Sequence, residues 1–461
     1  MGAQQSDRVG IIGGGSAAEA LAAELAGMFD VIVFESDLVG GECPFVACMP
    51  SKTMLHDGRV GHSWNDAVEH RRQVTDGLSD ERHVEGLRSN GIELVRARAS
   101  VVDVDTIEAD GERYHVDHIV LATGASAVVP SIDGIDDDRG ERLDGVWTSE
   151  DVYRATIQPD RVVILGAGVI GLETADMFRH FGTDVVVVDP IDRSLATAPP
   201  VLGDIVAGAL TSRGIDLRWG TEATALRPAE RREGQRDQVV VELSDGTSIA
   251  ADRVVVAVGR TPNTHDLGLE SIGIDPDEPL PVDDHGRLRV DGSIWAIGDV
   301  AGRGEYTHLA SHHALVVADR LRAGAGAGAG SRRFDDVVLS SCMFTTPPFI
   351  QVGPSWSELD GDDDVVSVGV DLSSIPRWST DRLGDGHLWV AARRSTREVI
   401  AAAGVGPSFD EIVHAIVVAI DGRVPVARLR HSMQPFPTIG EILGPAWNEL
   451  HQRLSEAPPN E

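Results

Sequence analysis

A short apolar run, a glycine-rich turn and apolar positions at helical spacing follow one another at the start of the chain. Residues 9–12 form the apolar run, and the segment GGGSAAEALAAELAG after it places alanine and leucine three and four positions apart. This pattern predicts a strand, a tight turn and a helix. A further strand is predicted at 31–34, with the acidic residue Glu35 at its end.

The same order of patterns recurs in the middle of the chain. An apolar run at 162–165 precedes GAGVIGLETADMF, and a strand predicted at 185–188 ends at Asp189. Glycines at such turns let backbone amides approach a pyrophosphate at a helix N-terminus, and the acidic residue accepts hydrogen bonds from a ribose. The turn residues assigned to this role are Gly13, Gly15 and Ala18 in the first copy and Gly166, Gly168 and Gly171 in the second. Two copies predict two dinucleotide-binding domains.

The remaining chain predicts a second kind of module. Residues 60–90 read as helical, 91–121 as short strands, 293–300 as one more buried strand, and 308–322 as a helix. The low-complexity stretch AGAGAGAG at 323–330 predicts a linker. Beyond it, strands at 388–392 and 399–403 and an amphipathic helix at 409–420 predict an α+β module without a nucleotide motif.

Charge and composition exclude several classes of function. The 461 residues include 73 acidic and 40 basic ones, a formal net charge of −33, which disfavours binding to nucleic acid. No apolar run approaches the roughly 20 residues that span a bilayer, so we expect no membrane segment. Three cysteines do not make a disulfide scaffold, and no secretory signal is evident, so a cytoplasmic location is expected. Lys52 is the only lysine.

Two of the cysteines, Cys43 and Cys48, lie in the string GGECPFVACMPSK. Residues five apart in an ideal helix have α-carbons about 8 to 9 Å apart, beyond the roughly 7 Å that a disulfide bridges. If the two pair, the backbone must leave the helical path, and Pro44 predicts that a helix begins only at or after it. A zinc site is a poor alternative because Cys342 is the only other cysteine, and no metal site is predicted. Two inert thiols remain an alternative.

Charged residues near these motifs suggest roles in redox chemistry. An ammonium at Lys52 can stabilise negative charge near a redox cofactor and lower a thiol pKa, and Glu173 is a candidate carboxylate partner. An exposed Lys52 without a role is the alternative. Asp189 favours the free 2′-hydroxyl of NADH over the 2′-phosphate of NADPH, although Arg193 lies four residues further on.

Taken together, these motifs resemble the group I pyridine nucleotide-disulfide oxidoreductases, the family of dihydrolipoyl dehydrogenase, glutathione reductase and mercuric reductase. GGECPFVACMPSK resembles the family string GGTCxxxGCxPSK, and GAGVIGLE and VVVVDPIDR resemble its NAD-binding turn and strand end. AIGDV, with Asp299, resembles the segment that binds the ribityl chain of FAD. ATGA, with Thr123 and Gly124, and GRTPN, after Gly259, also fit.

The resemblance implies an α/β fold of two Rossmann-like domains, for FAD and NAD, with a C-terminal α+β dimerisation domain. The implied ranges are 1–150 and 264–330 for the FAD and central parts, 151–263 for NAD(P) and 331–461 for dimerisation. Cys43 would attack a substrate disulfide, and Cys48 would lie near the flavin. Lys52 would lie beside the flavin and pair with Glu173, and Thr307 would contact the cofactor. The active protein would be a homodimer whose C-terminal segment completes the partner's site.

Several positions depart from the family pattern. Glu42 replaces a threonine and Ala47 a glycine. The family's closing motif HxHPTxxE supplies a histidine that transfers a proton to or from the substrate thiol, but this chain reads QPFPTIGE. Glu441 is retained, whereas Phe436 takes the histidine position and can transfer no proton. His431 is interpreted as a surface or structural residue.

These observations favour an NADH-dependent FAD enzyme that passes electrons through the Cys43–Cys48 disulfide to a small or protein disulfide. A reductase of a quinone or a metal ion is the alternative that Phe436 suggests. Mercury is a weak candidate, since mercuric reductases use a tyrosine at that position and a C-terminal cysteine pair, and the tail SEAPPNE has no cysteine. A non-enzymatic flavin-binding redox sensor is a third hypothesis.

Overall fold

The computed structural model describes residues 6–136, 140–229, 238–324 and 332–456. The chain divides into two compact units. The first consists of residues 1–54, 65–128 and 260–337, and the second of residues 55–64, 129–259 and 338–461. Most of the predicted linker at 323–330 lies outside the described residues. The four predicted domain ranges therefore stay predictions.

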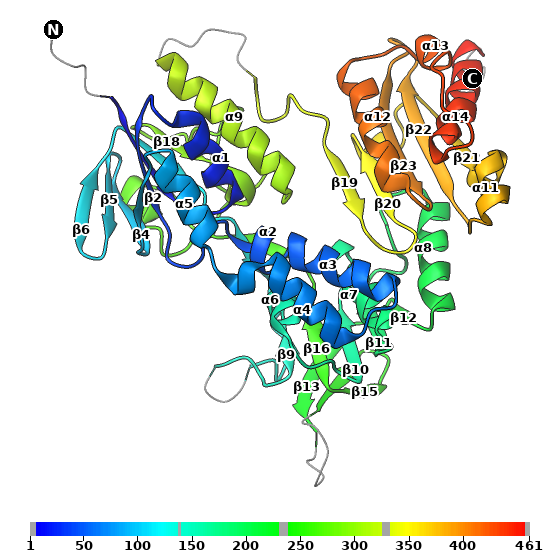
Figure 1. Cartoon of the computed structure of the whole chain (residues 1–461), viewed down its shortest axis with the longest axis horizontal. Coiled ribbons are helices and arrows are strands. Elements are labelled where there is room, and N and C mark those ends of the chain that lie inside the picture. Colours follow the sequence, from blue (N-terminus) through cyan, green and yellow to red (C-terminus); the bar gives the residue numbers. More distant parts are fainter. Residues whose placement is uncertain (1–5, 137–139, 230–237, 325–331, 457–461) are drawn as a thin grey trace. The chain divides into compact units, whose positions relative to one another are not determined.

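A five-stranded parallel sheet with the order β18-β7-β1-β2-β3 forms the centre of the first unit (Figure 1). Its strands are β1 (Arg8–Ile12), β2 (Asp30–Phe34), β3 (Glu93–Val95), β7 (His118–Leu121) and β18 (Ile294–Ala296). Helices α1 (Ser16–Leu25) and α9 (Thr307–Ala323) pack on each other, and α5 (Glu81–Ser89) packs on β3. Strands β1, β2, β7 and β18 are mostly apolar and buried, as expected for a parallel sheet that is covered on both faces, whereas β3 at the edge is partly exposed.

Further elements of the first unit lie around this sheet. An antiparallel sheet contains β4 (Ala99–Asp103), β5 (Thr106–Ala109) and β6 (Glu112–His115), and β8 (Ala125–Ala127) pairs with β17 (Arg260–Pro262). The helical segments are α2 (Glu42–Phe45), α3 (Cys48–Arg59), α4 (Trp64–Val74), η1 (Asp76–Leu78), η2 (Leu269–Ile272) and η3 (Gly298–Ala301). The last five residues of α3 and the first of α4 belong to the second unit.

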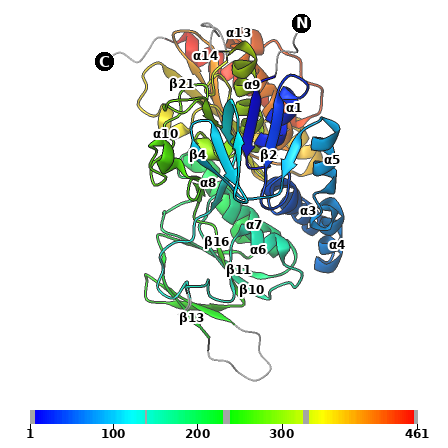
Figure 2. The same ribbon diagram turned by 90° about the vertical axis from the view of Figure 1, so that its left-hand side faces the viewer.

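The second unit contains another parallel sheet, with the order β12-β11-β10-β16-β9. Its strands are β9 (Val146–Trp147), β10 (Arg161–Leu165), β11 (Asp184–Asp189), β12 (Asp216–Trp219) and β16 (Arg253–Val256). Figure 2 shows α6 (Ser149–Arg154) and α7 (Val169–His180) beside β10, β11 and β16. Helix α8 (Pro200–Ser212) packs on β12, and β13 (Ala223–Pro228), β14 (Val239–Leu243) and β15 (Ser248–Ala251) form an antiparallel sheet.

The C-terminal part of the second unit is an antiparallel sheet with two long helices on one face. The strand order is β19-β20-β23-β22-β21, with bounds β19 (Ser340–Met343), β20 (Phe349–Val352), β21 (Val365–Asp371), β22 (His387–Arg393) and β23 (Val399–Val405). Helices α12 (Phe409–Asp421) and α14 (Leu443–Ser455) share one apolar core with these strands. The smaller segments are α10 (Trp356–Leu359), η5 (Leu372–Ser374), α11 (Pro376–Asp381), α13 (Val426–Leu429) and η6 (Ile439–Ile442).

The predicted α/β fold with two dinucleotide-binding units and a C-terminal α+β module is confirmed. Two details of the sequence analysis are wrong. The strand expected at 293–300 ends at Ala296, because Gly298 has φ +71° and starts a 3₁₀ turn. Helix α2 begins at Glu42, two residues before Pro44, because the amides of a helix's first turn need no intrahelical partner and so tolerate proline there.

Candidate active site

The two cysteines of the first unit lie close to one hydroxyl group. The Sγ atom of Cys48, the first residue of α3, lies 3.6 Å from Oγ1 of Thr307, the first residue of α9. The same hydroxyl donates to Sγ of Cys43 at 3.4 Å. Both cysteines are half-buried free thiols, and a side-chain hydrogen bond joins them. The backbone leaves the helical path between them, as pairing would require, because α2 ends at Phe45 and α3 starts at Cys48.

The environment separates the pKa values of the two thiols. The hydrogen bond with Cys43 lowers the pKa of Cys48 to about 6, against the effect of burial, and Thr307 and Lys52 lower it further. The same hydrogen bond raises the pKa of the Cys43 thiol, because it favours the protonated form of Cys43, and burial adds to the increase. A close pair of this kind loses its protons in two steps, and the first thiolate forms at Cys48. The reduced pair therefore contains a thiolate at Cys48 and a proton donor at Cys43 at neutral pH.

Lys52 lies on α3, one turn after Cys48, and its positive charge lowers the pKa of both thiols. Glu173 lies on α7 in the second unit, where its carboxylate is 4% exposed and its Oε1 atom accepts the Phe344 amide at 2.7 Å. The pairing of Lys52 with Glu173 stays a prediction.

The first glycine-rich turn forms a cradle that fits an adenine dinucleotide. A Cβ atom on Gly13, which has φ +102°, would lie 2.4 Å from the Ala122 carbonyl oxygen, and one on Gly41 would lie 2.9 Å from Cα of Gly15. Helix α1 begins without a side-chain cap, and the amides of a helix's first turn are suited to bind an anion. The Glu35 carboxylate accepts the Gly14 amide at 2.6 Å, which places it beside the turn where a ribose would bind.

Other predicted FAD residues also lie in the first unit. The Thr123 hydroxyl donates to the Asn263 carbonyl at 2.7 Å, and Gly124 accepts the Asn263 amide. These contacts join the ATGA and GRTPN strings. In the AIGDV segment, burial raises the pKa of the Asp299 carboxyl. Ala18 is fully buried in α1, so this position serves helix packing. The chain therefore offers the donors, the acceptors and the backbone cradle that FAD requires.

The second turn has the same construction in the second unit. A Cβ atom on Gly166 would lie 2.3 Å from the carbonyl oxygen of Ala257, and one on Gly171 would lie 2.0 Å from the carbonyl oxygen of Gly166. A Cβ atom on Gly168 would meet nothing within 4 Å. Gly168 therefore borders open space at the start of α7, where a pyrophosphate fits. The Asp189 carboxylate accepts the amides of Ala167 at 2.6 Å and Ile191 at 2.8 Å. Gly259, which ends the 253–259 segment, has φ +133° and also borders open space.

The C-terminal motif contains no imidazole at the predicted catalytic position. Phe436 is 72% exposed, and Glu441 accepts the Thr438 amide at 3.0 Å as part of a capping box. His431 is exposed, as expected for a surface residue. Glu441 thus stabilises its own turn. The residue at the position of the family's histidine, Phe436, has a phenyl ring in place of the imidazole.

Two contacts at the site were not predicted. Thr307 was assigned only to the cofactor, yet its hydroxyl contacts both thiols. The guanidinium of Arg260, in the GRTPN string, donates to Glu42 at 2.7 Å and to the Ala125 carbonyl. The replacement of the family threonine by Glu42 was the only signal for this ion pair. Within the described residues, no helix could span a membrane and no cluster could hold a metal ion.

Two dinucleotide cradles, a Cys-x₄-Cys thiol pair and a separate α+β module define a flavin- and nicotinamide-dependent disulfide oxidoreductase. The family model described as pyridine nucleotide-disulphide oxidoreductase matches residues 7–314, and the model of its dimerisation domain matches residues 339–446. The chain belongs to this family. It is therefore an enzyme that uses FAD and NAD(P)H.

Named relatives cover nearly the whole chain at modest identity. A mercuric reductase of Staphylococcus aureus is 27% identical over 94% of this chain and 80% of its own length. A dihydrolipoyl dehydrogenase of Haloferax volcanii is 29% identical over 92% of both chains. A solved structure, the Cu(II) complex of the HOCl-induced flavoprotein disulfide reductase RclA from Escherichia coli, has a TM-score of 0.85 and 26% identity and covers 97% of this chain and 100% of its own.

Proposed function

We propose that the enzyme transfers two electrons from NADH, through FAD and the Cys43–Cys48 disulfide, to a disulfide acceptor. The observation that carries the proposal is the thiol pair on the Thr307 hydroxyl, with the pKa of Cys48 at about 6. FAD, when bound, supplies the acceptor for the hydride of NADH. The balance is NADH, one proton and a disulfide giving NAD⁺ and two thiols.

The residues of the chain have distinct tasks in this scheme. Cys48, whose thiolate forms first, faces the flavin, and Lys52 balances its negative charge. Cys43 passes its hydrogen-bonded proton to the Cys48 thiolate and, as a thiolate, attacks the acceptor disulfide to form a mixed disulfide. The first leaving thiolate takes that proton from Cys48, which then resolves the mixed disulfide, and a solvent proton reaches the second leaving thiolate. Thr307 holds both sulfurs, and Glu173 balances the charge of Lys52.

Phe436 favours a second candidate acceptor. A thiolate leaving group is helped by a proton donor, and general acids contribute about 10² to 10⁴ in rate. An exposed phenyl ring supplies no proton, whereas a quinone or a metal ion needs no protonated thiol leaving group. The names of two relatives point the same way, since one is a mercuric reductase and one was solved as a Cu(II) complex.

The test of the redox disulfide is spectroscopic. Two-electron reduction of the wild type should produce a long-wavelength absorption band from the Cys48 thiolate to the flavin, and Cys48→Ser should abolish it. A wild type without the band, or a band that survives in Cys48→Ser, would exclude the assignment.

A substitution at Phe436 separates the two acceptor classes. Phe436→His, with Glu441 already in the motif, should raise turnover of small disulfides while leaving the stopped-flow rate of flavin reduction by NADH unchanged. Turnover of quinones or metal ions by the wild type should exceed its disulfide turnover if the second candidate is correct. A wild type that reduces a small disulfide as fast as NADH reduces its flavin has another proton donor, and the interpretation of Phe436 is then wrong.

The nicotinamide preference follows from Asp189. Its carboxylate is held by two backbone amides, and Arg193, the nearest basic residue of this strand end, donates to the Ala196 carbonyl at 2.5 Å. We expect kcat/KM for NADH to exceed that for NADPH at least about ten-fold, a difference of about 1.4 kcal/mol. Equal values would remove the role given to Asp189.

The enzyme is proposed to be a homodimer formed by the 331–461 module. The matched dimerisation domain supports this, as does the exposure of Met433 and Phe436, 95% and 72%, on a segment that the partner would cover. Light scattering at micromolar concentration should give twice 49.1 kDa. A monomer under those conditions contradicts the proposal.

A further inference from the structure

Two buried carboxylates lie one helical turn apart on α7, and both bind the same loop. Glu173 accepts the Phe344 amide at 2.7 Å, and Asp176 accepts the Thr346 amide at 2.9 Å and the Thr346 hydroxyl at 3.0 Å. Asp176 is fully buried and Glu173 is 4% exposed. The loop, residues 344–346, follows β19 of the C-terminal module. Its backbone therefore links the positions of the two carboxylates.

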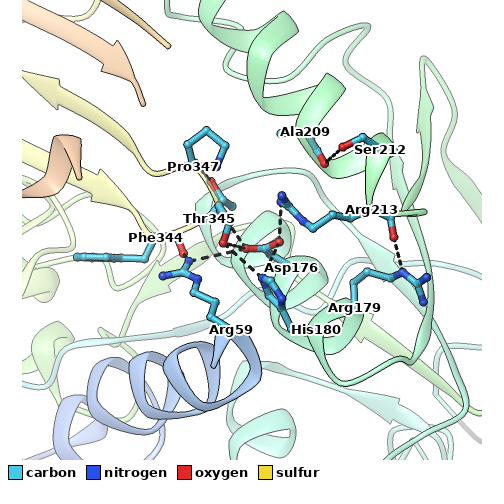
Figure 3. Close-up of polar contacts among 11 residues, drawn as sticks. Arg59, Asp176, Arg179, His180, Ala209, Ser212, Arg213, Phe344, Thr345 and Pro347 are labelled. Atoms are coloured by element: carbon cyan, nitrogen blue, oxygen red, sulfur yellow. Dashed lines mark hydrogen bonds and ion pairs between the residues drawn. The ribbon is translucent and has the colours of Figure 1, made fainter. Parts of the chain in front are cut away.

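Asp176 is the centre of a larger cluster (Figure 3). Its Oδ1 atom lies 2.7 Å from Nη2 of Arg213, at the end of α8, and 3.6 Å from Nε2 of His180. Its Oδ2 atom lies 3.7 Å from Nη2 of Arg59, the last residue of α3, and that guanidinium also donates to the Phe344 carbonyl. The carboxylate thus binds one loop and two arginines from distant parts of the sequence.

The surroundings of Asp176 favour its charged form. Burial alone would raise the pKa of its carboxyl, but His180 and Arg213 hold that pKa below the ordinary value. Removing one member of a buried ion cluster leaves the other charges uncompensated, so the cluster is sensitive to an isosteric change. Asp176→Asn would leave Arg59 and Arg213 without their shared anion.

We propose that Asp176 is a positioning residue for Glu173. By holding Thr346 and Arg59, Asp176 fixes the loop whose Phe344 amide holds the Glu173 carboxylate. The inference rests on the proposed function in one respect, the role of Glu173 in balancing the charge of Lys52. When Glu173 is displaced, the ammonium charge is less balanced, and the Cys48 thiolate becomes more stable.

The first experiment measures the loop itself. Hydrogen exchange of the Phe344 amide, read by mass spectrometry on the FAD-loaded protein, should become at least about ten-fold faster in Asp176→Asn, because the loop is held less firmly. The matched control is Asp252→Asn, which removes another buried carboxylate of the same unit, one that accepts the amides of Asp160 and Arg161 at 2.7 and 3.0 Å. Exchange at Phe344 that does not change in Asp176→Asn overturns the proposal, whether or not the reduced enzyme has a long-wavelength band.

The second experiment asks whether Asp176 acts through Glu173. Glu173→Gln should lower the pH midpoint of the long-wavelength band of the two-electron-reduced enzyme, and Asp176→Asn should lower it in the same direction by a smaller amount. In the Glu173→Gln background, Asp176→Asn should change the proton affinity of Cys48 by less than about two-fold. If Asp176→Asn shifts the band midpoint as much in the Glu173→Gln background as in the wild type, the lost Asp176 charge acts directly on the Cys48 thiol. The positioning role is then wrong.

A milder variant keeps the proposal testable if Asp176→Asn does not fold. Thr346→Val keeps the shape of the side chain and removes the hydroxyl that donates to Asp176. It should accelerate Phe344 exchange and lower the band midpoint, each less than Asp176→Asn would, and neither change should occur in Asp252→Asn. A wild type without the band would reject the proposed redox disulfide, whereas the exchange result would still decide whether Asp176 holds the loop.

Discussion

Replacing Thr307 by valine should raise the pKa of the Cys48 thiol. Valine keeps the shape of the side chain but removes the hydroxyl group that lies 3.6 Å from the Cys48 sulfur and 3.4 Å from the Cys43 sulfur. The hydroxyl stabilises the thiolate because it can donate a hydrogen bond, so its loss favours the protonated form. The thiolate exists above the pKa, and the absorption band that reports it should therefore appear at higher pH.

The size of the shift follows from the contact. Hydrogen bonds to charged groups contribute about 1.5 to 3 kcal/mol. Thr307 is exposed in this structure and its contacts to sulfur are long, so solvent screening reduces the value to about 1 kcal/mol. Since one pKa unit corresponds to 1.36 kcal/mol, the midpoint should rise by about 0.7 unit, from about 6 to almost 7.

The assay is an anaerobic pH titration of the long-wavelength band in the two-electron-reduced enzyme. Thr307→Ser is the matched control, because it loses the methyl group and keeps the hydroxyl. We expect Thr307→Ser to titrate within about 0.2 unit of the wild type, well under the shift predicted for valine. A Thr307→Val midpoint equal to that of the wild type, or an equal shift in both variants, would refute the role of the hydroxyl.

Three further predictions follow from the same structure. Cys43→Ala should raise the band midpoint by about one unit, because it removes the hydrogen bond that lowers the Cys48 pKa most, whereas Cys43→Ser, which can still donate, should shift it less. Neither variant can form the disulfide, so the band is titrated in the oxidised, FAD-loaded variants without added reductant. Equal midpoints of the two variants would contradict the assignment. Gly168→Ala should keep the fold and raise the KM for NADH about ten-fold, which steady-state kinetics measures. Gly171→Ala should instead lower the free energy of unfolding by more than about 2 kcal/mol, because its methyl group would lie 2.0 Å from a carbonyl oxygen. Chemical denaturation measures this loss, and equal stability of the two variants would be inconsistent with the geometry. The midpoint of thermal unfolding should be about 5 °C higher in about 1 M than in about 0.1 M potassium chloride. The acidic residues, which give a net charge of −33, repel one another less when the screening length falls from about 10 to 3 Å. Sucrose at matched osmolality is the control, and an unchanged midpoint would contradict the argument.

The sequence predicted the parts of the site that depend on local geometry. Strand, turn and helix follow one another within about 30 residues, and the positive φ angles of Gly13 and Gly166 belong to the turns where glycine repeats were seen. The acidic strand ends were equally accessible, since Glu35 and Asp189 each accept the amide of a residue in the preceding turn. Local periodicity and turn chemistry suffice for such features.

The contacts between distant segments could not be predicted in the same way. Thr307 lies 259 residues after Cys48, and Arg260 lies 218 residues after Glu42, so only the folded chain brings each pair together. For Asp176 a signal existed that was not used. It is a charged residue among the apolar positions of α7 that face the interior, and a buried carboxylate needs cationic or hydrogen-bonding partners.

Two of the three departures from the family pattern lie on the acceptor side of the proposed reaction, and the third, Ala47, directly precedes Cys48. The positions assigned to dinucleotide binding follow the pattern, including both glycine turns, both acidic strand ends and the AIGDV segment. Glu42 and Phe436, by contrast, replace residues beside Cys43, the proposed attacking thiol, and at the position that would handle the substrate proton. Glu42 forms an ion pair with Arg260, so the chain has compensated for the first change within its own fold. No described residue compensates in this way for Phe436, whose ring is exposed in the subunit. We therefore propose that the change at this position affects the acceptor. Electron entry from NADH should therefore follow the family scheme, and acceptor specificity is the property in which this enzyme should differ from the disulfide reductases it resembles.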